Sequence, residues 1–157
     1  MKVTTRDSEA LHQFAQGIVK ELLPMRDAAT VVTLSGELGA GKTTFAQGIA
    51  RALGVEETVS SPTFVIEKIY QLSGQRFEKL IHIDAYRLKN QHELDVLGWK
   101  EIITEPKNLI VLEWPERVAE AIPENAIRIR FDIEGDTRII SINGGEETST
   151  ERNGEIS

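Results

Sequence analysis

Hydrophobic and polar positions along the chain follow two different spacings, and the first stretch has the spacing of a helix. Apolar residues recur there every three or four positions, at Leu11, Phe14, Ile18 and Leu22. This is the period of one face of an amphipathic helix. Asp7 or Ser8 can cap its start, and Pro24 marks its end. The pattern therefore predicts a helix between Ser8 and Pro24.

Beyond this helix, short apolar runs alternate with helical patterns. Strand-like runs occupy residues 29–36, 63–72, 76–84, 108–114, 126–133 and 138–142. Helical patterns occupy residues 43–53, 90–102 and 115–122, and Gly98 interrupts the second of these. Turn sequences at residues 73–75 and 134–136 predict antiparallel hairpins between the strands that they join. We find no internal repeat, and we expect one domain at residues 1–143 and a polar, disordered tail at residues 144–157.

The composition narrows the class of protein that these elements build. With 157 residues, 40% of them hydrophobic and 27% charged, the chain fits one globular domain with a sizeable core. The net charge of −7 disfavours binding to DNA or RNA by charge alone. The sequence has no cysteine, no signal-peptide pattern and no apolar stretch that approaches ~18 residues. We therefore expect a cytoplasmic protein that binds neither DNA nor a membrane.

A glycine-rich segment follows the first strand-like run and leads into the next helix. Gly36, Gly41, Lys42 and Thr43 fit the Walker A pattern G-x-x-x-x-G-K-[ST]. Glycines let backbone N–H groups turn toward phosphate oxygens, the lysine can reach the β- and γ-phosphates, and the threonine hydroxyl can bind Mg²⁺. The segment therefore predicts nucleoside triphosphate binding. The predicted binding residues are Gly36, Glu37, Leu38, Gly39, Ala40, Gly41, Lys42, Thr43 and Thr44.

Two strand-like runs end in an acidic residue, which is where P-loop proteins place a second Mg²⁺ group. Glu113 follows four consecutive apolar residues, the pattern of a strand that is buried on both faces. We therefore assign Glu113 to Mg²⁺, directly or through water. Asp84 follows a less apolar run, and we expect it to support the metal indirectly or to orient the attacking water. For each acid the alternative is a solvated carboxylate at a strand end.

Three other residues lie near these segments. Thr63 follows a proline, and it is either a switch residue that contacts the γ-phosphate and the metal or a threonine that favours the strand. His82 alternates with Ile81 and Ile83 and so faces away from them, which favours a structural polar role. Trp114 directly follows the second acid, and we expect it to pack beside the site.

Rival classes of P-loop protein fit the sequence less well. Two Asp-x-x-Gly segments, at Asp95 and Asp132, match a GTPase switch motif, but neither follows an apolar strand at a suitable point, and no Asn-Lys-x-Asp motif is present. A small-molecule kinase is an alternative, although only Arg117, Arg128 and Arg130 are available for an arginine-rich lid. A nucleotide-binding adaptor without hydrolysis is a further alternative.

Four segments together resemble one family. They are GELGAGKTT at residues 36–44, SPTF at 61–64, HIDAYRL at 82–88 and LIVLEWPERV at 109–118, and their order and spacing are similar to those of the TsaE family. TsaE proteins are bacterial ATPases of tRNA threonylcarbamoyladenosine biosynthesis. The third and fourth segments are more specific than the first. The resemblance implies an α/β fold of the P-loop NTPase type, with a central, mostly parallel sheet, antiparallel additions and flanking helices.

The resemblance also implies a mechanism and partners. ATP is the implied substrate, Mg²⁺ the cofactor, and hydrolysis is slow unless the partner proteins TsaD and TsaB are present. The tRNA is then reached only through that complex. Lys42 carries over as a phosphate-binding group, and Thr43 and Glu113 carry over as Mg²⁺ ligands. Asp84 carries over as an acid needed for hydrolysis, and Thr63 as a switch residue. Less direct contacts with the nucleotide or a partner are implied for Trp114, Tyr86, Arg87 and Arg138.

Overall fold

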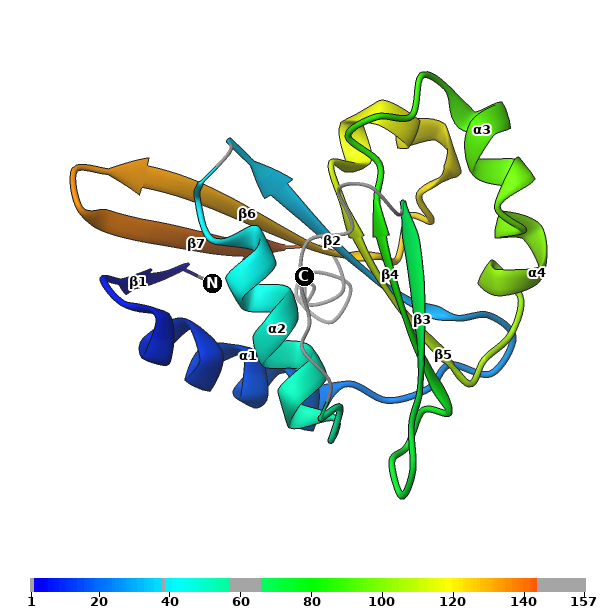
Figure 1. Cartoon of the computed structure of the whole chain (residues 1–157), viewed down its shortest axis with the longest axis horizontal. Helices are drawn as coiled ribbons and strands as arrows, with labels where there is room; N and C mark the ends of the chain where they lie inside the picture. Colours follow the sequence, from blue (N-terminus) through cyan, green and yellow to red (C-terminus); the bar gives the residue numbers. More distant parts are fainter. Residues whose placement is uncertain (1, 38, 57–65, 144–157) are drawn as a thin grey trace, which may run out of the picture.

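Seven strands form one mixed sheet in the computed structural model, which describes residues 2–37, 39–56 and 66–143 (Figure 1). The strands are β1 (Lys2–Thr5), β2 (Thr30–Gly36), β3 (Glu67–Gln71), β4 (Lys79–Asp84), β5 (Asn108–Glu113), β6 (Ile127–Glu134) and β7 (Thr137–Asn143). Their order across the sheet is β1-β7-β6-β2-β5-β4-β3. The tail expected at residues 144–157 lies outside the described residues.

The middle of the sheet is parallel and both edges are antiparallel. Strand β2 pairs in parallel with β5 and β6, and β4 pairs in parallel with β5. The predicted hairpins β3–β4 and β6–β7 are antiparallel, which confirms the expected fold class. Strand β1 was not predicted, because four mostly polar residues give no strand signal; it pairs with β7. The expected start of β3 at Thr63 lies outside the described residues.

Helices cover both faces of the sheet. They are α1 (Ser8–Glu21), α2 (Lys42–Ala52), α3 (Gln91–Val96), α4 (Trp99–Ile103) and the 3₁₀ helix η1 (Pro115–Ala121). Asp7 caps α1, since its Oδ1 accepts a hydrogen bond from the backbone N–H of Ala10 at 2.7 Å. Gly98, with φ +88°, separates α3 from α4 as predicted. The region predicted as a short helix after β5 is a 3₁₀ helix with a kink at Val118, so that prediction was only partly right. No helix within the described ranges is long and apolar enough to cross a membrane.

Two hydrophobic cores lie on opposite faces of the sheet, and alternate residues of each strand enter alternate cores. Val32 and Leu34 of β2 belong to the core that contains the α1 and α2 side chains. Val31 belongs to the second core, which holds Leu94 of α3 and Trp99 of α4. In Figure 1 α1 and α2 lie together, away from α3 and α4. This arrangement follows from the two-residue period of strands.

The same alternation decides where the polar ends of β4 and β5 point. Leu80 of β4 lies in the α1–α2 core, whereas Ile81 and Ile83 lie in the other core. His82 is therefore on the α1–α2 face, as its alternation with the two isoleucines predicted. Continuing the period by two residues places Asp84 on that face, beside the start of α2.

Candidate functional site

The glycine-rich loop joins the end of β2 to the start of α2, as its sequence predicted. Gly36 has φ +133°, and a Cβ there would lie 2.3 Å from the backbone oxygen of Phe131 in β6. Gly41 precedes α2 with φ +112°. An L-residue with a side chain rarely adopts such a conformation, so both positions require glycine. The loop consequently turns sharply between two buried elements and presents the N-terminus of α2 to the cavity described below.

Lys42 reaches back across this loop. Its Nζ donates hydrogen bonds to the backbone oxygens of Gly36 and Glu37, the second at 2.9 Å. The same ammonium lies 4.2 Å from the ring centroid of Trp114, a cation–π distance. These contacts hold a positive charge beside the loop, where a phosphate group would enter.

The surroundings of Lys42 affect its charge in opposite directions. Burial lowers the pKa of the Lys42 ammonium below its ordinary value of 10.5, because a buried charge loses hydration. Nearby carboxylates oppose this shift, and in decreasing order of effect they are Glu113, Glu116, Asp84 and Glu37. The loop lysine is therefore a poorly hydrated cation among acids, and the phosphates of a nucleotide would favour its charged form.

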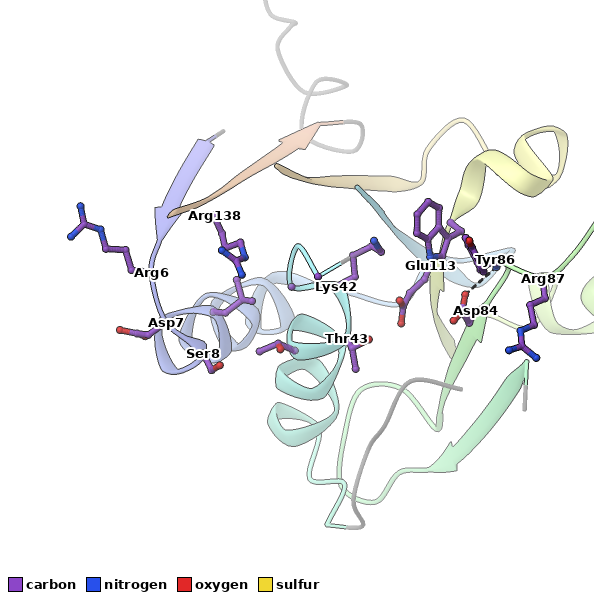
Figure 2. Close-up of a pocket in the computed structure, with 15 residues that line it drawn as sticks. Arg6, Asp7, Ser8, Lys42, Thr43, Asp84, Tyr86, Arg87, Glu113 and Arg138 are labelled. Carbon is purple, nitrogen blue, oxygen red and sulfur yellow. Dashed lines mark hydrogen bonds between the residues drawn. The ribbon is translucent and has the colours of Figure 1, made fainter. Parts of the chain in front are cut away.

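The two predicted acids lie side by side at the ends of neighbouring parallel strands. Asp84 of β4 and Glu113 of β5 are register partners. Glu113 is buried, with 2% of its surface exposed, whereas Asp84 is half-buried and its Oδ1 accepts a hydrogen bond from the backbone N–H of Tyr86 at 3.0 Å. Figure 2 shows Glu113 between Lys42 and Thr43 on one side and Asp84 on the other.

His82 makes a contact that its sequence pattern did not reveal. Its Nε2 lies 2.6 Å from Oε2 of Glu113, and both side chains are almost fully buried. His82 pairs in register with Val111, two residues before Glu113 on the adjacent strand. The period of two residues therefore puts both side chains on the same face. The sequence contains both residues but not the pairing of β4 with β5, so the structural role expected for His82 missed this contact.

Aromatic and basic side chains form a stack over the same end of the site. The rings of Tyr86 and Trp114 lie 4.9 Å apart, and the guanidinium of Arg117 lies 5.2 Å from the Tyr86 ring centroid. Trp114 has φ +62°, and within the described residues it is the non-glycine residue with positive φ. A tryptophan rarely adopts this conformation, and here it turns the ring back toward Lys42. The expectation that Trp114 packs beside the site is consistent with this geometry.

A cavity of about 420 Å³ joins these groups, within the size range of small-molecule sites. Its central lining comes from the loop, with Gly39, Gly41, Lys42, Thr43 and Thr44. One end is lined by Asp84, Tyr86, Arg87, Glu113 and Trp114. The other end is lined by Arg6, Asp7, Ser8, Leu11 and Arg138 (Figure 2).

The lining at this last end was mostly missed by sequence reasoning. Arg138 was predicted, but Asp7 and Ser8 were considered only as caps of the first helix, and Arg6 was not considered. Strand β1 pairs with β7, with Thr5 opposite Arg138, and so carries the start of α1 to the cavity. In Figure 2 the Arg6 side chain points away from the loop. Nothing local in the sequence indicates a pairing over so long a separation.

Some of the predicted loop and switch residues do not line the cavity or lie outside the described residues. Gly36, Glu37 and Ala40 shape the loop, and the first two accept hydrogen bonds from Lys42, but they do not line the cavity. Leu38 and Thr63 lie outside the described residues, so their predicted roles stay predictions.

The donor set at the strand ends suits Mg²⁺. The Thr43 hydroxyl and the carboxylates of Glu113 and Asp84 line the cavity together, and Mg²⁺ prefers such oxygen ligands. Across the described part of the chain, no three or more His, Asp or Glu side chains form a cluster able to hold a metal alone. A Mg²⁺ site in a phosphate-binding protein needs no such cage, because phosphates and water supply the other ligands.

The order strand, glycine-rich loop and helix, with two acids at the ends of adjacent parallel strands, is the arrangement of a P-loop α/β protein. This is the class that the fold and the site define together. The chain belongs to the TsaE family, because the family model described as threonylcarbamoyl adenosine biosynthesis protein TsaE matches residues 5–140. The TsaE family functions in tRNA threonylcarbamoyladenosine biosynthesis, and the resemblance stated from the sequence is confirmed.

Individual relatives agree with this assignment. The tRNA threonylcarbamoyladenosine biosynthesis protein TsaE of Streptomyces coelicolor is 38% identical over 138 residues, which cover 83% of this chain and 91% of the relative. The Haemophilus influenzae protein of the same description is 30% identical over 137 residues, with coverage of 87% and 84%. The crystal structure of Bacillus subtilis YdiB is similar to this chain with a TM-score of 0.72 and 29% sequence identity. The match covers 90% of this chain and 83% of the YdiB chain.

Proposed function

We propose that the protein binds ATP with Mg²⁺ and hydrolyses it in support of threonylcarbamoyl transfer to the tRNA adenosine beside the anticodon. The observation that carries this proposal is the meeting of Lys42, Thr43, Asp84 and Glu113 in one cavity. A cation, a hydroxyl and two acids at the mouth of a glycine-rich loop are the groups that phosphoryl transfer to water requires. Membership of the TsaE family supplies the connection to tRNA modification.

Each group has a distinct part in this proposal. The N-terminus of α2 and the Lys42 ammonium bind the phosphates and stabilise the charge that develops on the transferring group. Thr43 and Glu113 would hold Mg²⁺, which, when bound, neutralises charge on the β- and γ-phosphates. Asp84 is more exposed than Glu113 and lies beside it, so it can orient or deprotonate the attacking water.

The proposal includes partners, TsaD and TsaB, and slow hydrolysis in their absence. The sequence resemblance supports this part, and Tyr86 offers a surface for a partner, since the residue is 41% exposed while its ring contacts Trp114. A partner bound over Tyr86 and Arg87 would shield that end of the cavity from water, which strengthens the electrostatic interactions inside it. The tRNA would then be reached through the complex.

The test of this function is phosphate release from ATP, measured for the protein alone and with TsaD and TsaB added. We expect slow release alone and a marked increase with both partners. Phosphate release that is unaffected by the partners, together with a phosphorylated small molecule, would support the kinase alternative instead. ATP binding without hydrolysis in any mixture would support the adaptor alternative.

The end of the cavity at Arg138 offers a place for the nucleoside. It lies beyond the loop from Asp84 and Glu113 (Figure 2), so phosphates on the loop leave the ribose and base toward Arg138 and Ser8. Replacing Arg138 with alanine should weaken ATP binding about tenfold, the size of one lost hydrogen bond from a charged group. Titration of a fluorescent ATP analogue measures this change.

Arg130 provides the matched control for Arg138. It lies on the adjacent strand β6, and its guanidinium contacts Asp132 on the exposed surface at 3.3 Å. We expect Arg130→Ala to change ATP affinity less than twofold. Inorganic tripolyphosphate should bind the Arg138 variant as well as it binds the wild type. Equal losses for ATP and tripolyphosphate would place Arg138 at the phosphates instead of the nucleoside.

A further inference from the structure

We propose that His82 is a positioning residue, which holds the Glu113 carboxylate in the orientation needed for Mg²⁺ and away from Lys42. The inference rests on the proposed function, because it assumes that Glu113 serves the metal of a bound nucleotide. It adds a role that the sequence pattern of His82 did not indicate.

The contact between the two side chains is short and dry. His82 Nε2 and Glu113 Oε2 are 2.6 Å apart, and the side chains are 2% and 3% exposed. An ionised carboxylate can only accept hydrogen bonds, so the imidazole Nε2–H is the donor when Glu113 is charged. Both residues extend from adjacent strands in fixed register, so the sheet holds the two side chains next to each other on the same face.

This hydrogen bond fixes which carboxylate oxygen is available to a metal. Oε2 accepts from His82, so Oε1 is the oxygen without this contact, and we infer that it faces Mg²⁺ at the cavity that Glu113 lines. Mg²⁺ demands nearly ideal octahedral geometry. A ligand that is already oriented therefore loses less freedom on binding, which is how hydrogen-bond partners outside the ligand set raise metal affinity.

The same bond keeps two opposite charges apart. Of the carboxylates that favour the charged form of Lys42, Glu113 has the largest effect, so the pair attract each other. Without His82, a buried carboxylate would lack a partner, and Lys42 is a nearby cation. A Glu113–Lys42 ion pair would occupy the two groups that the phosphates and the metal need. The hydrogen bond from His82 therefore disfavours an ion pair between Glu113 and Lys42.

Three substitutions at His82 distinguish the effect of losing the hydrogen-bond donor to Glu113 from the effect of losing the imidazole ring. In His82→Gln, the amide N–H₂ reaches as far as Nε2 and can still donate to Glu113. In His82→Asn the amide is one carbon shorter and stops short, and in His82→Leu no donor remains. We would measure Mn²⁺ binding to the ADP complex by the loss of the free-ion electron paramagnetic resonance signal, and ADP binding without metal by calorimetry.

We expect His82→Leu and His82→Asn to weaken Mn²⁺ binding about tenfold or more, and His82→Gln to restore most of it. Because Glu113 can then pair with Lys42, metal-free ADP should bind the Leu and Asn variants more weakly than the wild type, and the Gln variant within about twofold of it. Thermal unfolding confirms that each variant is folded. If His82→Leu does not fold, the comparison of Asn with Gln decides, because both are polar and of similar size.

His12 is the matched control. It is also a buried histidine, but it lies on α1 and its Nδ1 contacts Arg51 at 3.1 Å. His12→Leu should leave Mn²⁺ affinity unchanged. Wild-type affinity in folded His82→Leu and His82→Asn would overturn the inference, as would an equal loss in His12→Leu. Absence of Mn²⁺ binding to the wild-type ADP complex would instead contradict the proposed function, so the two failures are distinguishable.

Discussion

Replacing Asp84 with asparagine is expected to reduce partner-stimulated phosphate release by a factor of about 10²–10³, the usual contribution of a positioned acid or base. ATP should still bind with nearly wild-type affinity, because Asp84 is half-buried at the end of β4, beside Glu113 and outside the glycine-rich loop that we propose binds the phosphates. Asparagine keeps the oxygen that accepts from the Tyr86 N–H, so the turn after β4 is preserved. The loss should therefore appear in turnover and not in binding.

Two measurements on the Asp84 variant decide this prediction. Phosphate release with TsaD and TsaB gives turnover, and titration of a fluorescent ATP analogue with and without Mg²⁺ gives binding. Asp132→Asn is a matched control, since the Asp132 side chain is 46% exposed and pairs with the surface residue Arg130 at 3.3 Å. A loss of Mg²⁺-dependent affinity with turnover preserved at saturation would show that Asp84 and Glu113 have exchanged roles.

The loop and the two acids could be predicted because their signals are local. Gly36 and Gly41 are glycines because the loop backbone has positive φ at both positions. Glu113 ends a run whose apolar residues enter both cores. Asp84 and Glu113 were assigned to one site because each ends a strand-like run, which is where P-loop proteins place such acids. Parallel strands bring their carboxyl ends to one edge of a sheet, and the two acids are register partners there, which agrees with that assignment.

Contacts that depend on strand pairing could not be predicted in the same way. His82 meets Glu113 only because β4 lies beside β5 in one register, and a shift by one residue would turn it to the opposite face. The cavity end at Ser8 depends likewise on β1 joining β7. Neither pairing leaves a pattern in the residues themselves, because backbone hydrogen bonds carry no sequence signature. The loop and the two acids were therefore visible in the sequence, whereas the His82 contact and the cavity end at Ser8 are properties of the topology.

Replacing Lys42 with methionine is expected to weaken ATP and tripolyphosphate binding about 100-fold or more, because a charge-assisted contact to two phosphates is lost. Methionine keeps an apolar side chain of similar length but has no ammonium to contact the Trp114 ring or to donate to Gly36 and Glu37. Calorimetric titration with each ligand measures the loss. Lys107→Met, at an exposed lysine that contacts Glu78 at 3.4 Å, is the control and should bind like the wild type.

Lys42→Met also tests how much the burial of the Lys42 charge lowers the stability of the folded protein. Since burial lowers the pKa of Lys42, the folded chain disfavours its charged form relative to the unfolded chain. This destabilisation is fully present below the folded-state pKa and disappears as the pH rises through 10.5, where the unfolded lysine also loses its proton. Lys42→Met should therefore unfold at an equal or higher denaturant concentration than the wild type at pH 7, with the difference shrinking in alkaline solution. A variant that loses both nucleotide binding and stability would mean that the Lys42 hydrogen bonds to its own loop outweigh the burial of its charge.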